Sequence, residues 1–268
     1  MEGRVLIVAG SDSGGGAGIQ ADIKAVTMLG GYAATAVTAL TAQNTRGVHG
    51  IYPVPPGFIA QQMHVVLEDI GADAIKTGML HSAEVIETVV RQVEKHARGT
   101  PVVVDPVMVA KGGARLLESA AESALKLRLL PIAAVVTPNI PEAEVLTGMT
   151  IATVEDMTRA VDALLALGPA AVLLKGGHLE GEVVVDILRT ADGEQHSFED
   201  TRIHTLHTHG TGCTLASAVA AGVAQGLRLQ DAVGRARDYV RQAIRTAPGI
   251  GTGHGPLNHA HPLIATEN

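Results

Sequence analysis

Short runs of β-branched and aliphatic residues recur along the chain, and each is followed by a turn rich in Gly, Pro or Asp and then by a longer amphipathic stretch. This alternation is typical of strand–helix–strand units, in which the strands run parallel and the helices cover both faces of the sheet. The pattern predicts strands at residues 4–9, 33–41, 73–77, 101–104, 133–137 and 170–175. It predicts helices at residues 18–29, 57–69, 82–96, 118–129, 141–146, 153–167, 211–225 and 229–245. We therefore expect an α/β fold of three layers, with a mainly parallel central sheet between helices.

A late pair of extended segments departs from this alternation. Residues 182–189 and 195–201 flank the turn Ala191-Asp192-Gly193, which predicts an antiparallel hairpin that extends the sheet. No proline-rich or low-complexity segment divides the 268 residues, so we expect a single domain over residues 1–258. Residues 259–268 are expected to form a loosely held tail.

The composition argues against several classes of partner. The chain has 20 Lys and Arg against 27 Asp and Glu and no basic block, so neither nucleic acid nor an anionic membrane is expected to bind it. Cys213 is the single cysteine, which excludes an internal disulfide and any multi-cysteine metal site and favours a reducing compartment. The apolar segments are too short to span a bilayer, so we expect a soluble, cytoplasmic protein.

Polar residues are concentrated in the loops that follow the predicted strands. Because parallel strands end at the same edge of a sheet, the loops after their carboxyl ends converge on one site. Six such loops carry candidate residues, at 10–16, 43–45, 76–79, 105–108, 137–139 and 175–178. The sequence therefore predicts one site at this edge of the sheet.

A seventh segment, the turn at residues 208–214, has the features of a phosphate site. It opens an apolar helix, and amide N–H groups at a helix N-terminus are unpaired and carry partial positive charge. The amides of Gly210, Thr211 and Gly212 are therefore candidates to hold a phosphoryl group. The competing interpretation is that the glycines only make a tight turn and that Cys213 is a small buried residue.

Taken in order, these segments resemble the ribokinase superfamily and, within it, the hydroxymethylpyrimidine/phosphomethylpyrimidine kinases of thiamine biosynthesis. The resembling segments are 9–22, 41–45, 76–80, 105–108, 137–143, 175–178 and 209–214. The resemblance implies a ribokinase-like fold, a homodimer and two ATP-dependent steps, in which an aminopyrimidine is phosphorylated on its hydroxymethyl group and its monophosphate is then converted to the diphosphate. Most sugar kinases of the superfamily carry an aspartate where this chain has Cys213, which favours the pyrimidine and pyridoxal branch.

Phosphoryl transfer requires an activated hydroxyl, a cradle for the moving charge and a metal ion. Cys213 is the candidate base, because the N-terminus of a helix can lower the pKa of a thiol. The amides of Gly210, Thr211 and Gly212 are the candidate cradle, since glycine allows a close approach that a Cβ atom would block.

Substrate recognition is assigned to Gln43, Asp22, Gly10, Met79 and Val107. The carboxamide of Gln43 complements the amine and ring nitrogen of an aminopyrimidine, and Asp22 is expected to accept a hydrogen bond from the ring or its hydroxymethyl group. Met79 and Val107 are expected to wall the ring. The alternatives are a polar turn residue for Gln43, a solvated helix charge for Asp22 and ordinary core for the apolar pair.

The opposite end of the site is assigned to ATP and Mg²⁺. Asp105 and Glu142 supply the oxygen ligands that Mg²⁺ prefers, partly through water, although a turn former and a helix-dipole partner are the alternatives. Asn139, Lys175 and Thr208 are expected to contact the nucleotide, with a solvated surface charge as the alternative for Lys175. No Gly-x-x-x-x-Gly-Lys-Ser/Thr sequence occurs, which disfavours a P-loop nucleotidase.

Other segments receive weaker predictions. His207 and His209 have no cysteine or nearby carboxylate partners in sequence, so phosphate contact or plain loop structure is preferred over zinc. The histidines expected at the surface are His49, His64, His81, His96 and the terminal ones. Residues 108–113 are a candidate flap that excludes water from ATP. Residues 14–16 are a candidate site for the phosphate of the monophosphate substrate. The glycines at 251–255 lack a strand–helix unit and are not a dinucleotide fingerprint.

Two other functions compete with the pyrimidine kinase. One is a pyridoxine or pyridoxal kinase, which also phosphorylates a hydroxymethyl group on a nitrogen heterocycle, and Gln43 is the residue that best separates the two. The other is a pyrimidine-binding protein without catalysis, against which the candidate base, metal ligands and glycine turn argue.

Overall fold

The computed structural model describes residues 1–109, 113, 116–118 and 120–264, and in this part of the chain nine strands form one sheet. Their order is β3-β2-β1-β4-β5-β6-β7-β8-β9. Six neighbouring strands run parallel: β2 (Tyr32–Asn44), β1 (Arg4–Asp12), β4 (Ala74–Thr77), β5 (Val102–Val104), β6 (Val135–Val136) and β7 (Ala171–Lys175). Three pair antiparallel: β3 (Gly47–Pro53), β8 (Val183–Thr190) and β9 (Gln195–Thr201). The predicted parallel sheet and late hairpin are confirmed.

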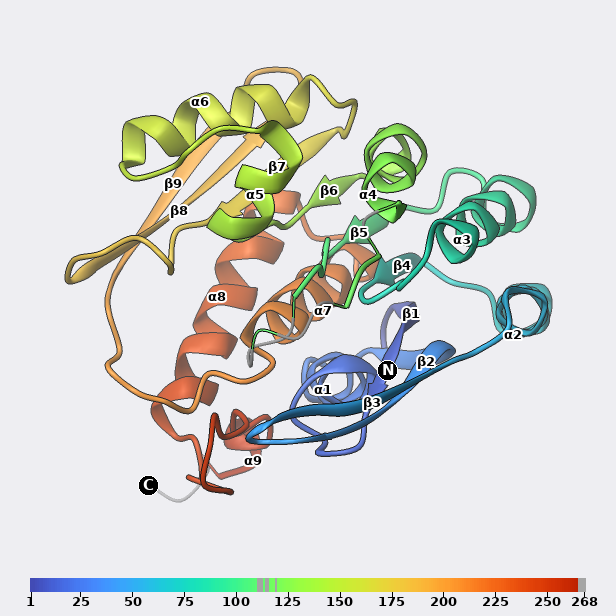
Figure 1. The fold of residues 1–268 in the computed structure, drawn as a ribbon, viewed down its shortest axis with the longest axis horizontal. Coiled ribbons are helices and arrows are strands. Elements are labelled where there is room, and N and C mark those ends of the chain that lie inside the picture. The colour runs from blue at the N-terminus through green and yellow to red at the C-terminus, as the bar shows by residue number, and fades with distance from the viewer. Residues whose placement is uncertain (110–112, 114–115, 119, 265–268) are drawn as a thin grey trace.

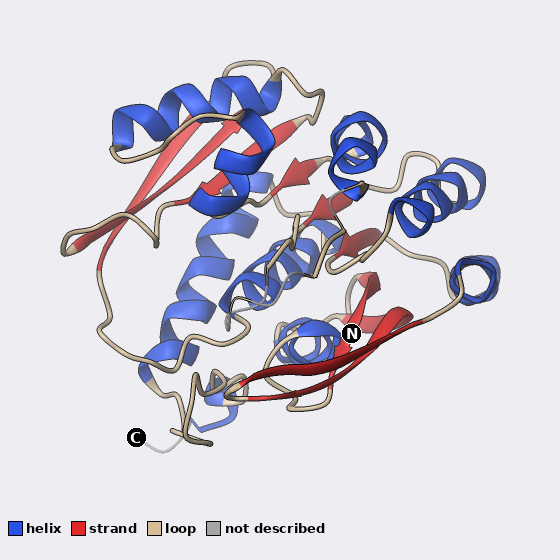
Figure 2. Ribbon diagram, viewed as in Figure 1, coloured by secondary structure: helices blue, strands red, loops and turns tan. Residues whose placement is uncertain are grey.

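Helices cover both faces of this sheet, so the molecule has three layers (Figures 1 and 2). One layer holds α1 (Gly18–Met28), α7 (Thr211–Ala224) and α8 (Leu229–Arg245). The other holds α2 (Pro56–Asp69), α3 (Ala83–His96), α4 (Ala121–Ala124), α5 (Ile140–Thr147) and α6 (Val154–Leu165). The alternating side chains of β1 join the two layers, because Leu6 and Val8 enter one buried cluster and Val5 and Ile7 the other. No helix in the described ranges is long and apolar enough to cross a membrane.

Two predicted elements differ from the structure. The second strand extends beyond residue 41 to Asn44 and turns back as β3, so residues 43 and 44 end a strand rather than form a loop. Gly47, Gly50 and Pro53 in β3 weaken the strand signal in sequence, which is why it was not expected. The predicted helix at 118–129 is α4 followed by a π turn over Leu125–Leu129 and a 3₁₀ turn over Leu130–Ile132, where Pro131 interrupts α-helical bonding.

The expectation of a loose tail is wrong for residues 259–264. His259 is 5% exposed, its Nε2 lies 2.9 Å from Thr214 Oγ1, and its carbonyl oxygen accepts a hydrogen bond of 2.8 Å from the Tyr239 hydroxyl. Burial lowers the pKa of His259 to about 4, so the ring is neutral at physiological pH, contrary to the surface position expected for it. A short helix, α9 (His261–Ile264), follows, and residues 265–268 lie outside the described residues.

Helices α7 and α8 pack so closely that one position between them has room only for glycine. A Cβ atom on Gly222 of α7 would lie 2.6 Å from the Cβ and 3.0 Å from the Cα of Ala232 on α8. Gly234 on α8 is a contrasting case, because the nearest heavy atom to its Cβ position is a ring carbon of Phe198 at 4.0 Å. The first helix of this pair carries the glycine turn, so its packing also positions the site.

We predict that Gly222→Ala lowers the free energy of unfolding by about 1–3 kcal/mol, because overpacking outweighs the better helix propensity of alanine. The matched variant Gly234→Ala has space for its methyl group and should raise stability by about 0.5–1 kcal/mol. Urea unfolding of both variants measures the difference. A Gly222→Ala variant as stable as Gly234→Ala would contradict close packing of α7 on α8.

Candidate active site

The carboxyl ends of the parallel strands open into a pocket of about 820 Å³ in the described part of the chain. Its walls include all but one of the residues that the sequence assigns to the site. These are Gly10, Gln43, Met79, Asp105, Val107, Asn139, Glu142, Lys175, Thr208, Gly210, Thr211, Gly212 and Cys213. The exception is Asp22.

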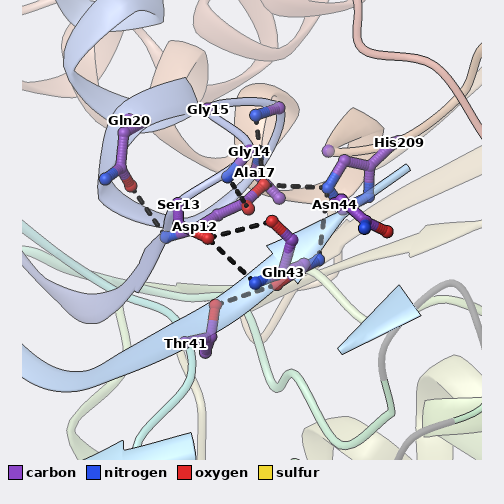
Figure 3. Close-up of polar contacts among 12 residues, drawn as sticks. Asp12, Ser13, Gly14, Gly15, Ala17, Gln20, Thr41, Gln43, Asn44 and His209 are labelled. Carbon is purple, nitrogen blue, oxygen red and sulfur yellow. Dashed lines mark hydrogen bonds and ion pairs between the residues drawn. The ribbon is translucent and has the colours of Figure 1, made fainter. Parts of the chain in front are cut away.

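At one end of the pocket the Asp12 carboxylate joins two glycine-rich loops (Figure 3). It accepts hydrogen bonds from the backbone N–H groups of Gly14, Gly16 and Ala17 at 2.8, 3.0 and 2.8 Å, and its Oδ2 lies 2.9 Å from Nε2 of His209. Burial acts to raise the pKa of Asp12, but the hydrogen bonds from His209 and the backbone outweigh burial and lower it. An ionised Asp12 therefore holds the loop before α1 against the turn before α7.

The same contacts correct one expectation and refine another. The amides of Gly14 and Gly16 bind the Asp12 side chain, and the amide of Gly15 donates to the Asp12 carbonyl at 2.9 Å. Residues 14–16 therefore have no amide left to hold a substrate phosphate, and that prediction is wrong. His209 has the loop-structure role expected for it, and no cluster of three or more His, Cys, Asp or Glu able to hold a metal occurs among the described residues.

Gln43 is the second-last residue of β2, and both its backbone and its side chain are fixed by hydrogen bonds (Figure 3). Its N–H donates to Ser13 Oγ at 2.9 Å, and its carbonyl oxygen accepts from the same hydroxyl at 2.9 Å. Its carboxamide lies between Thr41 Oγ1, 3.1 Å from Oε1, and His209 Nε2, 3.3 Å from Nε2. His209 Nε2 must carry a proton to bond the ionised Asp12. The Gln43 carboxamide then fits both neighbours when its oxygen faces His209 and its nitrogen faces Thr41.

Asp22 does not face the pocket, and the prediction that it contacts substrate is wrong. It is 0% exposed, both its oxygens lie 2.8 Å from Nζ of Lys76, and Ser217 Oγ donates to it at 2.7 Å. Position 22 lies one helical turn beyond Gly18, and that turn carries it from the pocket edge into the space between β4 and α7. The sequence signal that was missed is Lys76, because a lysine inside a buried strand requires a nearby counter-charge.

Lys76 is itself a pocket-lining residue that sequence reasoning did not single out. Burial works against its positive charge, but the neighbouring Asp22 carboxylate outweighs burial and raises the pKa of the ammonium group. Cys213 and Asp105 act on it in the same direction. The pair is therefore ionic and places a positive charge at the base of the pocket.

At the opposite end of the pocket the carboxylates of Asp105 and Glu142 both attract the ammonium group of Lys175. Nζ of Lys175 lies 3.3 Å from Asp105 Oδ1, and Glu142 is 7% exposed. Burial raises the pKa of Glu142 to about 7; Asp105 acts in the same direction, whereas Lys175 opposes it. Lys175 is thus held in the site rather than on a solvated surface.

The first turn of α5 orients Glu142 through a reciprocal cap. The Glu142 N–H donates to Asn139 Oδ1 at 2.9 Å, and the Asn139 N–H donates to Glu142 Oε2 at 2.8 Å. Such a capping box fixes both side chains at the start of the helix. The Asn139 oxygen is therefore used for capping, and Glu142 keeps its second carboxylate oxygen for another partner.

The glycine turn begins α7 between these two ends. Gly210 is the N-cap with a φ of 82°, and a Cβ atom there would lie 1.9 Å from the carbonyl oxygen of Gly16, so only glycine fits. A Cβ atom on Gly212 would lie 3.3 Å from Lys175 Nζ and 3.8 Å from the carboxylate oxygens of Asp105. The turn therefore lies within reach of both charged groups.

The thiol of Cys213 does not have the lowered pKa expected at a helix N-terminus. Burial raises the pKa of Cys213 to about 12, although the ammonium group of Lys76 acts in the opposite direction. Cys213 is half-buried and lines the pocket, and the sequence shows the helix start but not how strongly the surrounding protein desolvates the thiol. In the candidate flap, residues 110–112 lie outside the described residues, whereas Met108 and Val109 line the pocket.

Similarity to known proteins covers nearly the whole chain. Residues 12–258 match the family described as phosphomethylpyrimidine kinase. The thiamine biosynthesis bifunctional protein ThiED of Geobacter sulfurreducens is 57% identical over 99% of this chain, which spans 53% of that protein and so about half its length. A Bacillus subtilis hydroxymethylpyrimidine/phosphomethylpyrimidine kinase is 47% identical over 96% of this chain and 94% of that protein. A solved ADP complex of Bacillus subtilis pyridoxal kinase superposes with a TM-score of 0.90 at 34% identity, covering 98% and 100% of the two chains.

We predict that Lys76→Met lowers the free energy of unfolding by about 3–5 kcal/mol, because it leaves Asp22 as a buried charge without its ammonium partner. The double variant Asp22→Leu/Lys76→Met removes both charges and should recover most of that loss. Urea unfolding at neutral pH measures both variants. Equal losses in the single and the double variant would show that packing, not the ion pair, sets the stability here.

Proposed function

The chain belongs to the phosphomethylpyrimidine kinase family, and from this premise we propose that it phosphorylates 4-amino-5-hydroxymethyl-2-methylpyrimidine and then the resulting monophosphate, in thiamine biosynthesis. ATP is the phosphate donor in both steps. The observation that carries this function is the convergence of Gln43, the glycine turn and the Asp105–Glu142–Lys175 group on one pocket. The Bacillus subtilis relative is matched over 94% of its length, which supports placing both steps on this chain.

The charged end of the pocket fits a nucleotide with Mg²⁺. Burial and the neighbouring Asp105 carboxylate make it costly to ionise Glu142. A divalent cation bound beside both carboxylates would relieve that cost. Asp105 and Glu142 would hold the ion with water and phosphate oxygens completing its shell, and the ion would neutralise phosphate charge. Lys175 and Thr208 would contact the ATP phosphates, and Asn139 would keep Glu142 in place through the α5 cap.

The reacting end of the pocket combines the glycine turn with Cys213. Backbone amides of Gly210 and Gly212 would stabilise the charge on the moving phosphoryl group, whereas the Thr211 N–H donates to the Thr208 carbonyl oxygen at 3.3 Å. Cys213 would accept the proton of the substrate hydroxyl, which requires the thiolate, because a thiol carries no free site for that proton. Burial and the carboxylates of Asp22 and Asp105 oppose this thiolate, whereas Lys76 and a backbone hydrogen bond from Gly18 favour it. The fraction of thiolate therefore limits the rate.

The ring-binding end supports a pyrimidine over a pyridine. Gln43 offers a carboxamide held by Thr41 and His209, and Gly10, Met79 and Val107 would enclose the ring. Of two relatives from Bacillus subtilis, the pyrimidine kinase is 47% identical and the pyridoxal kinase 34%. Pyridoxine or pyridoxal kinase activity remains the second candidate because its fold superposes so closely. On the resemblance alone we also propose a homodimer located in the cytoplasm.

The function is tested by comparing three acceptors at saturating ATP: the aminopyrimidine alcohol, its monophosphate and pyridoxine. We expect kcat/KM for each pyrimidine to exceed that for pyridoxine at least about tenfold, the scale of one well-formed polar contact. Coupled detection of ADP with mass spectrometry of the products measures all three. A higher kcat/KM for pyridoxine would replace the pyrimidine assignment with the second candidate.

We predict that Cys213→Ala lowers kcat by roughly 10²–10⁴-fold, the contribution of a general base, while the Kd for the pyrimidine stays unchanged. Because the pKa of Cys213 lies near 12, kcat of the parent enzyme should rise with pH by up to about tenfold per unit around neutrality, and the alanine variant should lose this rise. Calorimetry gives the Kd, and the thermal unfolding midpoint controls for misfolding. Unchanged turnover would remove Cys213 from the mechanism.

A further inference from the structure

Residues 249–259, called the strap below, form a glycine-rich segment after α8 that the kinase chemistry does not use. The strap passes the turn between β2 and β3, then the glycine turn, and then the first turn of α7. These three places flank Gln43, His209 and Cys213. The strap therefore connects the parts of the pocket that must act on the same substrate.

The first contact is with the turn of the β2–β3 hairpin. The N–H of His254 donates to the Thr45 carbonyl oxygen at 2.8 Å, and the N–H of Gly253 donates to Thr45 Oγ1 at 3.3 Å. Arg46 Nε donates to Thr252 Oγ1 at 2.9 Å. Thr45 lies two residues beyond Gln43, so the end of the strand that carries Gln43 is fixed by the strap.

The second contact is with the glycine turn. The N–H of His209 donates to the carbonyl oxygen of Gly255 at 3.2 Å, and His209 pairs with Pro256 in a parallel bridge. His209 also contacts Asp12 and Gln43 through its ring. The strap thus holds the backbone of the residue whose side chain joins the two glycine-rich loops.

The third contact is with helices α7 and α8. His259 Nε2 lies 2.9 Å from Oγ1 of Thr214, the residue after Cys213. The N–H of Asn258 donates to the carbonyl oxygen of Ala243, and the Tyr239 hydroxyl donates to the His259 carbonyl oxygen. Two helices therefore anchor the end of the strap in the protein core.

Glycine at alternate positions allows this close approach. A Cβ atom on Gly251 would lie 2.4 Å from Thr45 Oγ1, one on Gly253 would lie 2.1 Å from the Thr45 carbonyl oxygen, and one on Gly255 would lie 2.4 Å from His207 Nδ1. Residues 251–254 form bends, and at each of the three glycines a neighbouring atom occupies the space that a Cβ atom would need. The spacing therefore serves contact with neighbouring loops rather than binding of a nucleotide.

From these contacts we propose that the strap is a positioning element, which sets the place of Gln43 relative to the glycine turn and so controls binding of the heterocycle. The proposal rests on the proposed function for the identity of the ligand. Gly253 is its key residue, because its contact is with the Thr45 backbone, which cannot rotate away as a side chain can.

The test is Gly253→Ala, assayed with the aminopyrimidine and ATP. We expect KM for the pyrimidine to rise about tenfold, since a displacement of about 1 Å at a recognition group has effects of that order or more, while KM for ATP changes less than about twofold. The control is Gly50→Ala on β3 of the same hairpin, where the new methyl group would meet only Ala42 Cβ at 3.8 Å. It should leave both constants unchanged. Equal rises in both KM values, or no rise, would overturn the proposal.

Hydrogen exchange on the unmodified protein covers the case in which Gly253→Ala fails to fold. The pyrimidine alone should increase protection of the amides in residues 249–259, and ATP alone should not. Absence of protection by a pyrimidine that demonstrably binds would overturn the proposal.

If the unmodified protein neither binds nor phosphorylates the pyrimidine, the proposed function fails, and the strap is then tested by hydrogen exchange without ligand. Faster exchange of residues 43–48 in Gly253→Ala than in Gly50→Ala would support it, and equal exchange would overturn it.

Discussion

Parallel pairing of six neighbouring strands is the constraint on which the rest of this molecule depends. It brings Asp12, Gln43, Lys76, Asp105 and Lys175 to one edge of the sheet, although these residues are far apart in sequence. Backbone hydrogen bonds and two apolar helix layers hold that edge in place, so most of the polar residues there, in contrast to Asp12 and to Lys76 with its partner Asp22, need not stabilise the fold. They are free to form a site whose two ends carry different chemistry.

Two buried cations divide the electrostatics of this site. Lys76 is paired with Asp22 within the core. Because this ion pair is already in place, its electrostatic field at the pocket does not have to be created when substrate binds. Lys175 instead pairs with Asp105 and also attracts Glu142, so the charged end carries one more carboxylate than ammonium groups. Phosphoryl transfer between nucleotide and alcohol requires such an asymmetry, because one end must attract a metal–phosphate complex while the other must accept a neutral heterocycle.

Much of this arrangement is predictable from sequence, for identifiable reasons. Buried strands followed by polar loops are local patterns, so the sheet, the late hairpin and most pocket residues follow from periodicity and from the rule on strand ends. Asp22 shows the limit of such reasoning, because it lies on the same face of α1 as Gly18 but one turn, or about 6 Å, further along the helix, beyond the edge of the pocket. The pKa of Cys213 and the Asp12–His209 pair could not be predicted from local sequence patterns either. The pKa depends on depth of burial, and the pair joins residues 197 positions apart, neither of which a local pattern records.

Close backbone crossings explain how a chain with only 2% aromatic residues defines a specific pocket. Gly210 crosses Gly16, Gly253 crosses Thr45, and Gly176 approaches the carbonyl oxygen of Val185 so closely that a Cβ atom would lie 2.0 Å from it. Backbone contacts of this kind cannot relax by rotating a side chain, so they transmit a displacement from one loop to the next. At these crossings one loop can move only together with its neighbour, so a closure that excludes water during transfer is expected from parts of the pocket wall outside them.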